Sequence, residues 1–185
     1  MKQIIIDVPE GYEVGRDERS GDRVTIQFKK IEKPQPLNFA TMPCGVYIID
    51  GTQAYMAKEW GNSPADGVLL ATPYWFIAID RQVPDKSMDW SDARDWARAR
   101  KILDRQCDLF DRHQGLHIFD NLEEINACME AIGGDIIPDN WHWTKDEVKH
   151  APRCAFVVFM YYGLVGCSLK YTFFCVRAVS AFPRF

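Results

Sequence analysis

Long apolar runs are missing from this chain of 185 residues. A membrane-spanning helix needs about 20 consecutive apolar residues, and because no run approaches that length, no membrane span is expected. The opening residues also lack the pattern of a secretory signal, since the apolar stretch at 4–6 is short and ends at Asp7. We therefore expect a chain without a signal peptide.

Motifs that identify enzymes and cofactor sites are also missing. The chain has no glycine-rich nucleotide loop, no metalloprotease helix, no hydrolase nucleophile turn and no EF-hand loop. Asp139, Asp146 and Glu147 are candidates for acid–base catalysis or calcium binding, but calcium needs several clustered oxygen ligands, which residues 141–144 do not supply. The net charge of -4 gives no reason to expect a nucleic-acid partner. We expect no catalytic residue and no cofactor.

Cysteine pairs of the CxxC type are absent, although the chain has six cysteines. Their absence excludes a zinc ribbon and a thioredoxin-like motif. Without a signal peptide we expect a reducing compartment, in which the cysteines are free and mostly buried. His113 and His117 have the spacing of metal ligands on a helix, but no third ligand is evident, so no metal site is expected.

Asparagine and glutamine are missing from residues 141–185, which is unusual for a stretch that must contain turns. This stretch carries six basic and two acidic residues, a charge of +4, so the rest of the chain carries -8 to give the total of -4. It also holds eleven of the 24 aromatic residues (6 Trp, 7 Tyr and 11 Phe). The C-terminal stretch is therefore basic and aromatic in an otherwise acidic chain.

The N-terminal part is expected to be a small β-hairpin. A short strand is expected at residues 4–8, and residues 24–28 alternate apolar with polar side chains, which is typical of a half-buried strand. The polar residues 17–22 between them are expected to be a loop. The prolines in 33–36 indicate a linker, so we expect an N-terminal extension at 1–38 and one domain at 39–185.

The order of elements in that domain is typical of an α+β fold. Helices are predicted at 91–103, capped by Ser91 or Asp89, and at 122–132, where Asn121 and Glu124 form a capping box. Strands are predicted at 45–50, within 67–80 with a break at Pro73, and at 155–162 and 170–179 in one sheet, with 55–60 either a strand or a helical turn. Because helices do not alternate with strands, the fold is not doubly wound. We expect two helices and a mixed or antiparallel sheet.

Several segments together resemble a known family. They are residues 121–127, 131–135, the aromatic pair Trp141 and Trp143, then 155–156, Gly163 and the ending at 176–182 with its Arg-x-Val pattern. Over about residues 45–182 the chain resembles the variable proteins of diversity-generating retroelements, which occur in gut Bacteroides and their phages. The resemblance implies a C-type-lectin-like fold, related to the formylglycine-generating-enzyme branch and to the phage major tropism determinant. It also implies a cytoplasmic or phage-associated location.

In that family the last stretch is a variable region, which corresponds here to about residues 141–182. Adenines of a template repeat are randomised during reverse transcription, so an AAC-type codon yields Phe, Tyr, Ser, Cys, Leu, His or Arg, among others, but never Lys, Glu, Gln, Met or Trp. The resemblance thus accounts for the missing asparagine. It marks seventeen residues as products of such codons: His150, Pro152, Arg153, Cys154, Val158, Tyr161, Tyr162, Leu164, Gly166, Cys167, Ser168, Leu169, Tyr171, Thr172, Phe173, Phe174 and Cys175. Lys149, Met160 and Lys170 do not fit the rule and are expected to be scaffold or drift.

The resemblance implies a rigid, non-catalytic scaffold whose C-terminal face recognises an unknown protein or cell-surface ligand. Aromatic and arginine side chains dominate binding hot spots, and tyrosine with serine or glycine is typical of antibody-like surfaces. The candidate ligand-binding residues are His142, His150, Arg153, Tyr161, Tyr162, Leu164, Ser168, Tyr171 and Phe173. Phe156, Phe159, Phe174 and Val176 are expected in the core.

Two alternatives stay open at the level of sequence. An enzyme of the formylglycine-generating type would use a pair of late cysteines, for which this chain offers Cys167 and Cys175. A structural or adhesive phage component would use the N-terminal hairpin for oligomerisation, so a homo-oligomer is also open.

Overall fold

The computed structural model describes residues 12–20, 23–30, 34–61 and 63–184, with side chains from residue 34 onward. Two units separate by their internal contacts, Met1–Pro34 and Gln35–Phe185. In the first unit, β1 (Tyr12–Ser20) pairs antiparallel with β2 (Arg23–Lys30). The strand predicted at 24–28 is confirmed as part of β2, and the one predicted at 4–8 lies outside the described residues.

The loop predicted at 17–22 is wrong for its first four residues, which belong to β1. Asp17 pairs with Ile26 and Ser20 with Arg23, after an irregularity in the ladder that begins at Val14. The polar side chains suggested a loop, but a ladder is held by backbone hydrogen bonds that every non-proline residue supplies.

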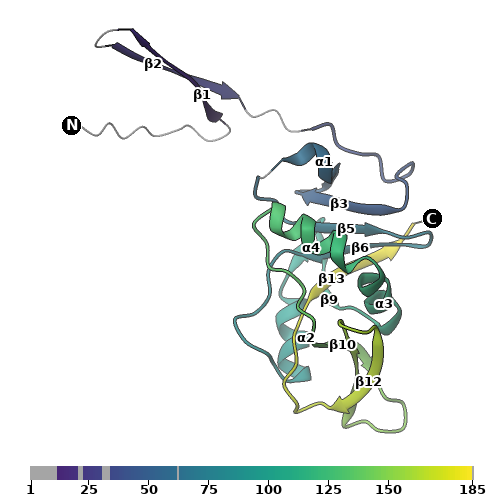
Figure 1. Ribbon diagram of the computed structural model, residues 1–185. Coiled ribbons are helices and arrows are strands. Elements are labelled where there is room, and N and C mark those ends of the chain that lie inside the picture. The colour runs from purple at the N-terminus through teal and green to yellow at the C-terminus, as the bar shows by residue number, and fades with distance from the viewer. Residues whose placement is uncertain (1–11, 21–22, 31–33, 62, 185) are drawn as a thin grey trace. The chain divides into compact units, whose positions relative to one another are not determined.

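The second unit is α+β, built around a six-stranded antiparallel sheet of order β4-β3-β5-β6-β13-β9 (Figure 1). The strands are β3 (Gly45–Asp50), β4 (Gln53–Met56), β5 (Gly67–Ala71), β6 (Trp75–Asp80), β9 (Asp108–Leu109) and β13 (Ala178–Pro183). The strand predicted at 45–50 and the two predicted on either side of Pro73 are confirmed. The 55–60 segment contains both alternatives, because β4 ends at Met56 and a helical turn α1 (Ala57–Trp60) follows.

Both faces of this sheet are buried. Successive side chains of a strand point to opposite faces, which explains why its strands are apolar at consecutive positions. One face packs Tyr47, Ile49 and Leu69 against Trp90 and Ala93 of helix α2 (Trp90–Arg98). The other face is covered by α3 (Arg112–Asp120) and α4 (Leu122–Ala131), whose buried residues are Ile118, Ile125 and Met129.

The helix predicted at 91–103 begins as expected but ends early. The Asp89 carboxylate caps α2 by accepting a hydrogen bond from the Asp92 N–H. The helix ends at Arg98, and the chain then forms the ribbon of β7 (Lys101–Ile102) and β8 (Arg105–Gln106). Leu103 and Asp104 make its turn with positive φ angles of 54° and 56°, a backbone conformation that no helix contains.

Helix α3 is absent from the sequence prediction, and the capping box belongs to it. Asp111 caps α3 by accepting from the Gln114 N–H, and the Gln114 side chain accepts in return from the Asp111 N–H. The box predicted at Asn121 and Glu124 is wrong, because Asn121 already ends α3 and its side-chain amide donates to the His117 carbonyl. Helix α4 itself matches the prediction at 122–132 to within one residue.

A second, three-stranded antiparallel sheet of order β10-β11-β12 carries the C-terminal stretch, and Figure 1 shows it at the end of the unit far from α1 and β3. Its strands are β10 (Trp141–Glu147), β11 (Cys154–Phe159) and β12 (Leu164–Leu169). The strand predicted at 155–162 is confirmed as β11, three residues shorter at its end.

The strand predicted at 170–179 is wrong. β12 occupies 164–169 instead, and β13 begins only at Ala178 and belongs to the six-stranded sheet. Between them the chain crosses from one sheet to the other and touches β10 at Cys175, which exchanges backbone hydrogen bonds with Trp141 and Trp143. The apolar run at 171–179 therefore reflects a surface segment followed by a core strand, rather than one strand.

Candidate ligand-binding surface

The turn between β11 and β12 requires a glycine at position 163. Its φ of 65° lies in the left-handed region, and a Cβ at this position would lie 2.6 Å from the Phe119 ring. Both features make any residue other than glycine energetically costly at this position. Tyr161 and Tyr162 lie in this turn, and both are more than half exposed.

Four rings next to this turn form the aromatic cluster, which consists of Trp141, Phe159, Tyr161 and Tyr162. The Trp141 and Phe159 rings stack with centroids 4.8 Å apart, and the two tyrosine rings meet edge to face at 4.4 Å. Phe159 lies 6.2 and 5.9 Å from the two tyrosine rings, so the cluster is continuous.

The sequence prediction included only the two tyrosines of this cluster. It placed Phe159 in the core and did not select Trp141, whereas both rings are partly exposed. The signal that identifies them is the β10–β11 register, in which Trp141 is the direct partner of Phe159. Register cannot be read from composition, because it depends on which strands pair.

A second group of candidates lies at the other end of β12. His150, Arg153, Tyr171 and Phe173 are all exposed, and the Lys170 N–H donates to the Arg153 carbonyl, which joins their two loops. Ser168 is half-buried and donates to the Thr172 hydroxyl at 3.2 Å. Leu164 is exposed and belongs with the aromatic cluster at the start of β12.

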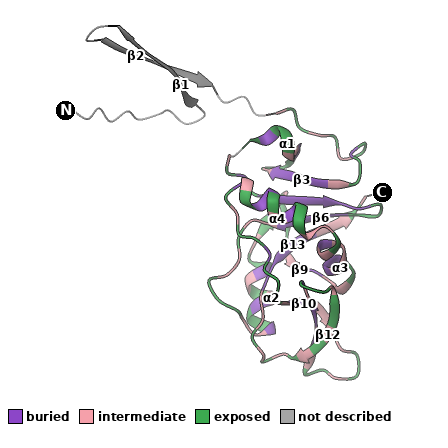
Figure 2. Ribbon diagram, in the orientation of Figure 1, coloured by how far each residue is buried: buried purple, intermediate pink, exposed green. Residues whose placement is uncertain are grey.

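The candidate residues therefore form two groups rather than one. Six residues of extended strand separate the groups by about 17 Å, at a rise of about 3.4 Å per residue. Figure 2 shows that β12, which connects them, is itself largely exposed. Val165 and Leu169 of β12 are exposed apolar residues that the candidate set lacked.

His142 was wrongly predicted to be on this surface. It is fully buried, because it alternates along β10 with Trp141 and Trp143 and so points to the opposite face of the sheet, toward Phe110. Its Nδ1–H donates to the Asn140 carbonyl at 3.0 Å, and its Nε2 has no hydrogen-bond partner among the described residues. Burial, partly offset by the hydrogen bond to Asn140 and assisted by the nearby Arg177 charge, lowers the pKa of His142 to about 4.

Of the four residues expected in the core, only Val176 is fully buried. Phe156, Phe159 and Phe174 are partly exposed. Phe156 lies under the Arg112 guanidinium at 4.1 Å, and Phe174 meets the Trp143 ring edge-on at 4.9 Å. Full burial is therefore wrong for the three phenylalanines: Phe156 and Phe159 lie on the central strand β11, and the partly exposed Phe174 packs against the core.

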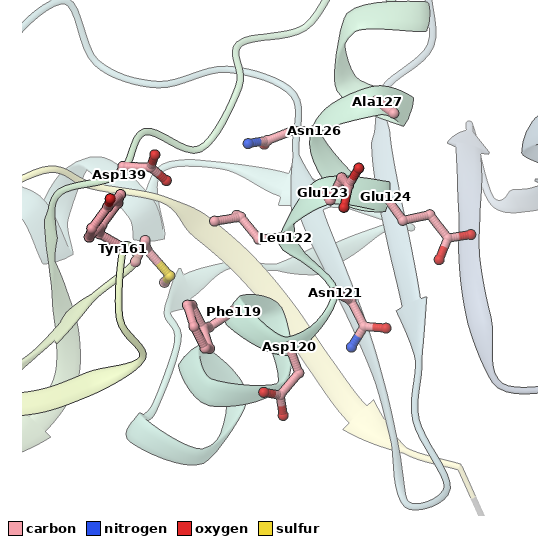
Figure 3. A pocket seen from close by; sticks show the side chains of 11 residues that line it. Phe119, Asp120, Asn121, Leu122, Glu123, Glu124, Asn126, Ala127, Asp139 and Tyr161 are labelled. Carbon is pink, nitrogen blue, oxygen red and sulfur yellow. The ribbon is translucent and has the colours of Figure 1, made fainter.

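An acidic groove of about 820 Å³ adjoins the aromatic cluster. Its lining includes Phe119, Leu122, Met160 and Tyr161. It contains no basic residue and four carboxylates, which belong to Asp120, Glu123, Glu124 and Asp139. Figure 3 shows Asp139 beside Tyr161 on one side of the groove and the first turns of α4 on the other. Tyr161 belongs to both features, so the groove and the cluster form one continuous surface.

The two cysteines of the enzyme alternative lie at opposite edges of the small sheet. Cys167 is on β12, and Cys175 is bonded to the far side of β10. The three strand spacings between them amount to about 14 Å, whereas a disulfide needs Cα atoms within about 7 Å. This geometry removes the sequence argument for a catalytic cysteine pair.

All six cysteines are free, but the expectation that most are buried is wrong. Cys107 and Cys128 are buried, Cys154 and Cys175 are partly exposed, and Cys44 and Cys167 are exposed. Burial raises the pKa of Cys107 to about 12, so this thiol stays protonated at neutral pH.

The predicted histidine pair lies on α3, with His113 exposed and His117 partly exposed. Among the described residues, no three or more His, Cys, Asp or Glu side chains are grouped as metal ligands. No helix in the described part of the chain has the length and apolar content needed to cross a membrane.

No protein-family model matches this chain, and no curated protein sequence matches it.

Proposed function

We propose that this chain is a non-catalytic ligand-binding protein with a C-type-lectin-like fold, and that the surface along β12 recognises a protein or cell-surface partner. We further propose that it is a variable protein of a diversity-generating retroelement, and that residues 141–182 are its variable region. The ligand-binding residues on this proposal are those already named apart from the buried His142, with Trp141, Phe159, Val165 and Leu169 added.

The observation that carries the proposal is the concentration of exposed apolar side chains. Of the ten large apolar residues that are exposed in the described chain, seven lie within 161–173. Tyr162, Tyr171 and Phe173 each expose about two thirds of their surface, at 64%, 69% and 64%. Exposed apolar side chains lose the free energy that their burial would contribute. A concentration of them on a monomer is therefore typical of an interaction surface.

The exposure of the residues that fit randomised codons supports the same proposal. Of the seventeen residues marked above as products of randomised AAC-type codons, sixteen are at least partly exposed and Val158 is buried; His142 and Arg177 also fit the codon rule and are buried. Two of the incompatible residues have structural roles instead: Met160 is buried, and Lys170 pairs with Glu147. Residues free to vary should avoid the core, because core substitutions destabilise the fold.

Removing four exposed rings should abolish binding without affecting the fold. We expect the variant with Tyr161, Tyr162, Tyr171 and Phe173 all changed to Ser to bind a partner isolated with the wild-type chain roughly 100-fold more weakly, because a few aromatic side chains carry most of the binding energy. The matched control is Tyr74→Ser, which removes an equally exposed ring from the β5–β6 turn. Titration calorimetry measures the affinity of both variants for the partner. An affinity of the fourfold-substituted variant within threefold of the wild-type value would contradict the proposal.

The retroelement origin has its own test in the DNA beside the gene. We expect a near-copy of the codons for residues 141–182 next to a reverse-transcriptase gene, with adenines wherever the two copies differ. Sequencing the flanking DNA checks this. Differences spread over all four bases, or the absence of a second copy, would overturn the retroelement proposal and leave the binding surface to be judged alone.

A further inference from the structure

The outer edge of β12 presents backbone groups that no other described strand uses. In an antiparallel pair, directly opposed residues alternate between exchanging both backbone hydrogen bonds and exchanging none. The Lys170 N–H donates to the Arg153 carbonyl, so this opposed pair is of the bonded kind. Counting back along the register, Ser168, Gly166 and Leu164 also bond inward to β11.

The intervening residues Val165 and Cys167 therefore point their N–H and C=O groups away from β11. The Leu169 N–H points the same way, while the Leu169 carbonyl accepts a hydrogen bond from the Thr172 N–H. The other side of the small sheet is closed, because Cys175 bonds to β10 there. Within the described chain, β12 is thus the open edge of this sheet.

This edge lacks the features that protect exposed strands from pairing. Such strands are usually shielded by charged residues, proline or a bulge. β12 has the sequence Leu-Val-Gly-Cys-Ser-Leu, with no charge and no proline, and its register with β11 is unbroken over all six residues. Leu164, Val165 and Leu169 are also exposed. An open, apolar and regular edge is suited to accept another strand.

The two ends of β12 differ in charge. Leu164 follows Gly163, which packs on Phe119 at the acidic groove with its four carboxylates. At the other end, Lys149, His150 and Arg153 are exposed, and two of the acids nearby are paired, Glu147 with Lys170 and Asp146 with Arg112. A ligand lying along β12 therefore meets negative charge at one end and positive charge at the other.

We propose that the partner presents an extended polypeptide segment that adds to the small sheet as a fourth strand, antiparallel to β12. Its centre is apolar, its N-terminal end carries Asp or Glu, and its C-terminal end carries Lys or Arg. This inference rests on the proposed function and names the form of its partner. An extended chain fits because only it repeats donors and acceptors at the two-residue period of Val165 and Cys167. The antiparallel direction places its basic end at the acidic groove.

Proline at position 167 tests the pairing directly. Because the Cys167 N–H points outward, Cys167→Pro removes a donor from the open edge without removing a bond to β11, which is where strands tolerate proline. Cys167→Ala is the matched control, since it keeps the N–H. The probes are linear peptides of twelve random residues, displayed and selected on the wild-type chain, then synthesised. We expect the selected peptides to bind Cys167→Pro at least tenfold more weakly, and Cys167→Ala within twofold of wild type.

Two further measurements do not depend on the proline variant folding normally. Amide hydrogen exchange on the wild-type chain should slow at least tenfold at Val165 and Cys167 when a selected peptide binds. Exchanging the charged ends of that peptide should weaken binding at least fivefold at low salt, and less at high salt because exposed charges are screened.

Several outcomes would overturn the inference. They are a library that yields no binder, binders that tolerate Cys167→Pro in a folded chain, and unchanged exchange at Val165 and Cys167. A dimer of the chain alone in light scattering, dissociated by Cys167→Pro, would show that a second copy takes the edge instead. Peptides lost with the fourfold ring variant but indifferent to Cys167→Pro would leave the proposed function standing and contradict only the strand pairing.

Discussion

Replacing Arg177 with methionine should destabilise the larger unit by about 3 to 5 kcal/mol, because it removes three hydrogen bonds that one buried charged group donates. The Arg177 side chain is fully buried. Its guanidinium donates to the carbonyl of Asp80 at 2.9 Å and to those of Asp135 and Ile136 at 2.8 Å each. These bonds attach the end of β6 and the segment after α4 to the start of β13. Burial lowers the pKa of Arg177 to about 10, so the group stays charged at neutral pH.

Urea unfolding followed by tryptophan fluorescence measures this loss. The free energy of unfolding of Arg177→Lys should lie between those of wild type and Arg177→Met. One ammonium group keeps the charge but cannot match the planar geometry with which arginine serves three carbonyls. The matched control is Arg153→Met, which removes a charge from the exposed surface of the same stretch and should change stability by less than about 0.5 kcal/mol. A value for Arg177→Met within 1 kcal/mol of wild type would contradict this role.

Arg177 illustrates why part of the architecture is hidden in the sequence. It counts there as one of six basic residues in an aromatic stretch, indistinguishable by composition from the exposed Arg153. Its three carbonyl partners lie 97, 42 and 41 residues earlier. Backbone carbonyls have no sequence signature, so only the folded chain shows that one arginine joins these segments.

The parts of the fold that could be predicted are those encoded locally. The strand at 45–50, the pair broken at Pro73 and the α4 helix each carry their own apolar pattern and their own stop signal. The prediction fails at 170–179, where the apolar residues Tyr171 and Phe173 are exposed rather than packed. Apolar periodicity assumes that apolar side chains are buried, and the assumption breaks down at a surface of this kind.

The candidate surface was likewise predictable in composition but not in arrangement. The excess of tyrosine and phenylalanine and the missing asparagine pointed to the stretch in which most of the exposed large apolar side chains lie. That the candidates form two groups, that Trp141 and Phe159 join one of them, and that β12 is an open edge all follow from strand register. His142 shows the opposite error, because a polar residue in the stretch proposed to be variable suggested exposure, while alternation along β10 buries it.

His142 should make the stability of the chain fall between pH 6.5 and pH 4.5. Its pKa is about 4 in the folded chain, lowered first by burial and then by Arg177 and only partly restored by the bond to Asn140, against an ordinary value of 6.5. The unfolded chain therefore binds a proton that the folded chain excludes. The stabilisation is complete above pH 6.5 and is lost as pH falls through 4, by about 3.5 kcal/mol in total at about 1.4 kcal/mol per pKa unit, with about 2 kcal/mol of it lost between pH 6.5 and pH 4.5.

The His142→Gln variant separates this effect from the rest of the chain, because glutamine is of similar size and can still donate to the Asn140 carbonyl but does not titrate. Urea unfolding at half-unit pH intervals should give a flat free energy for the variant between pH 6.5 and pH 4.5, and a falling one for wild type. The lower limit matters because the hydrogen bond from Lys170 lowers the pKa of Glu147, whose stabilising effect fades below its ordinary value of 4.5. His150→Gln, at an exposed position of the same stretch, is the matched control and should follow wild type. Equal slopes for wild type and His142→Gln would mean that His142 takes up its proton in the folded chain, and hence that the β10 interior admits water.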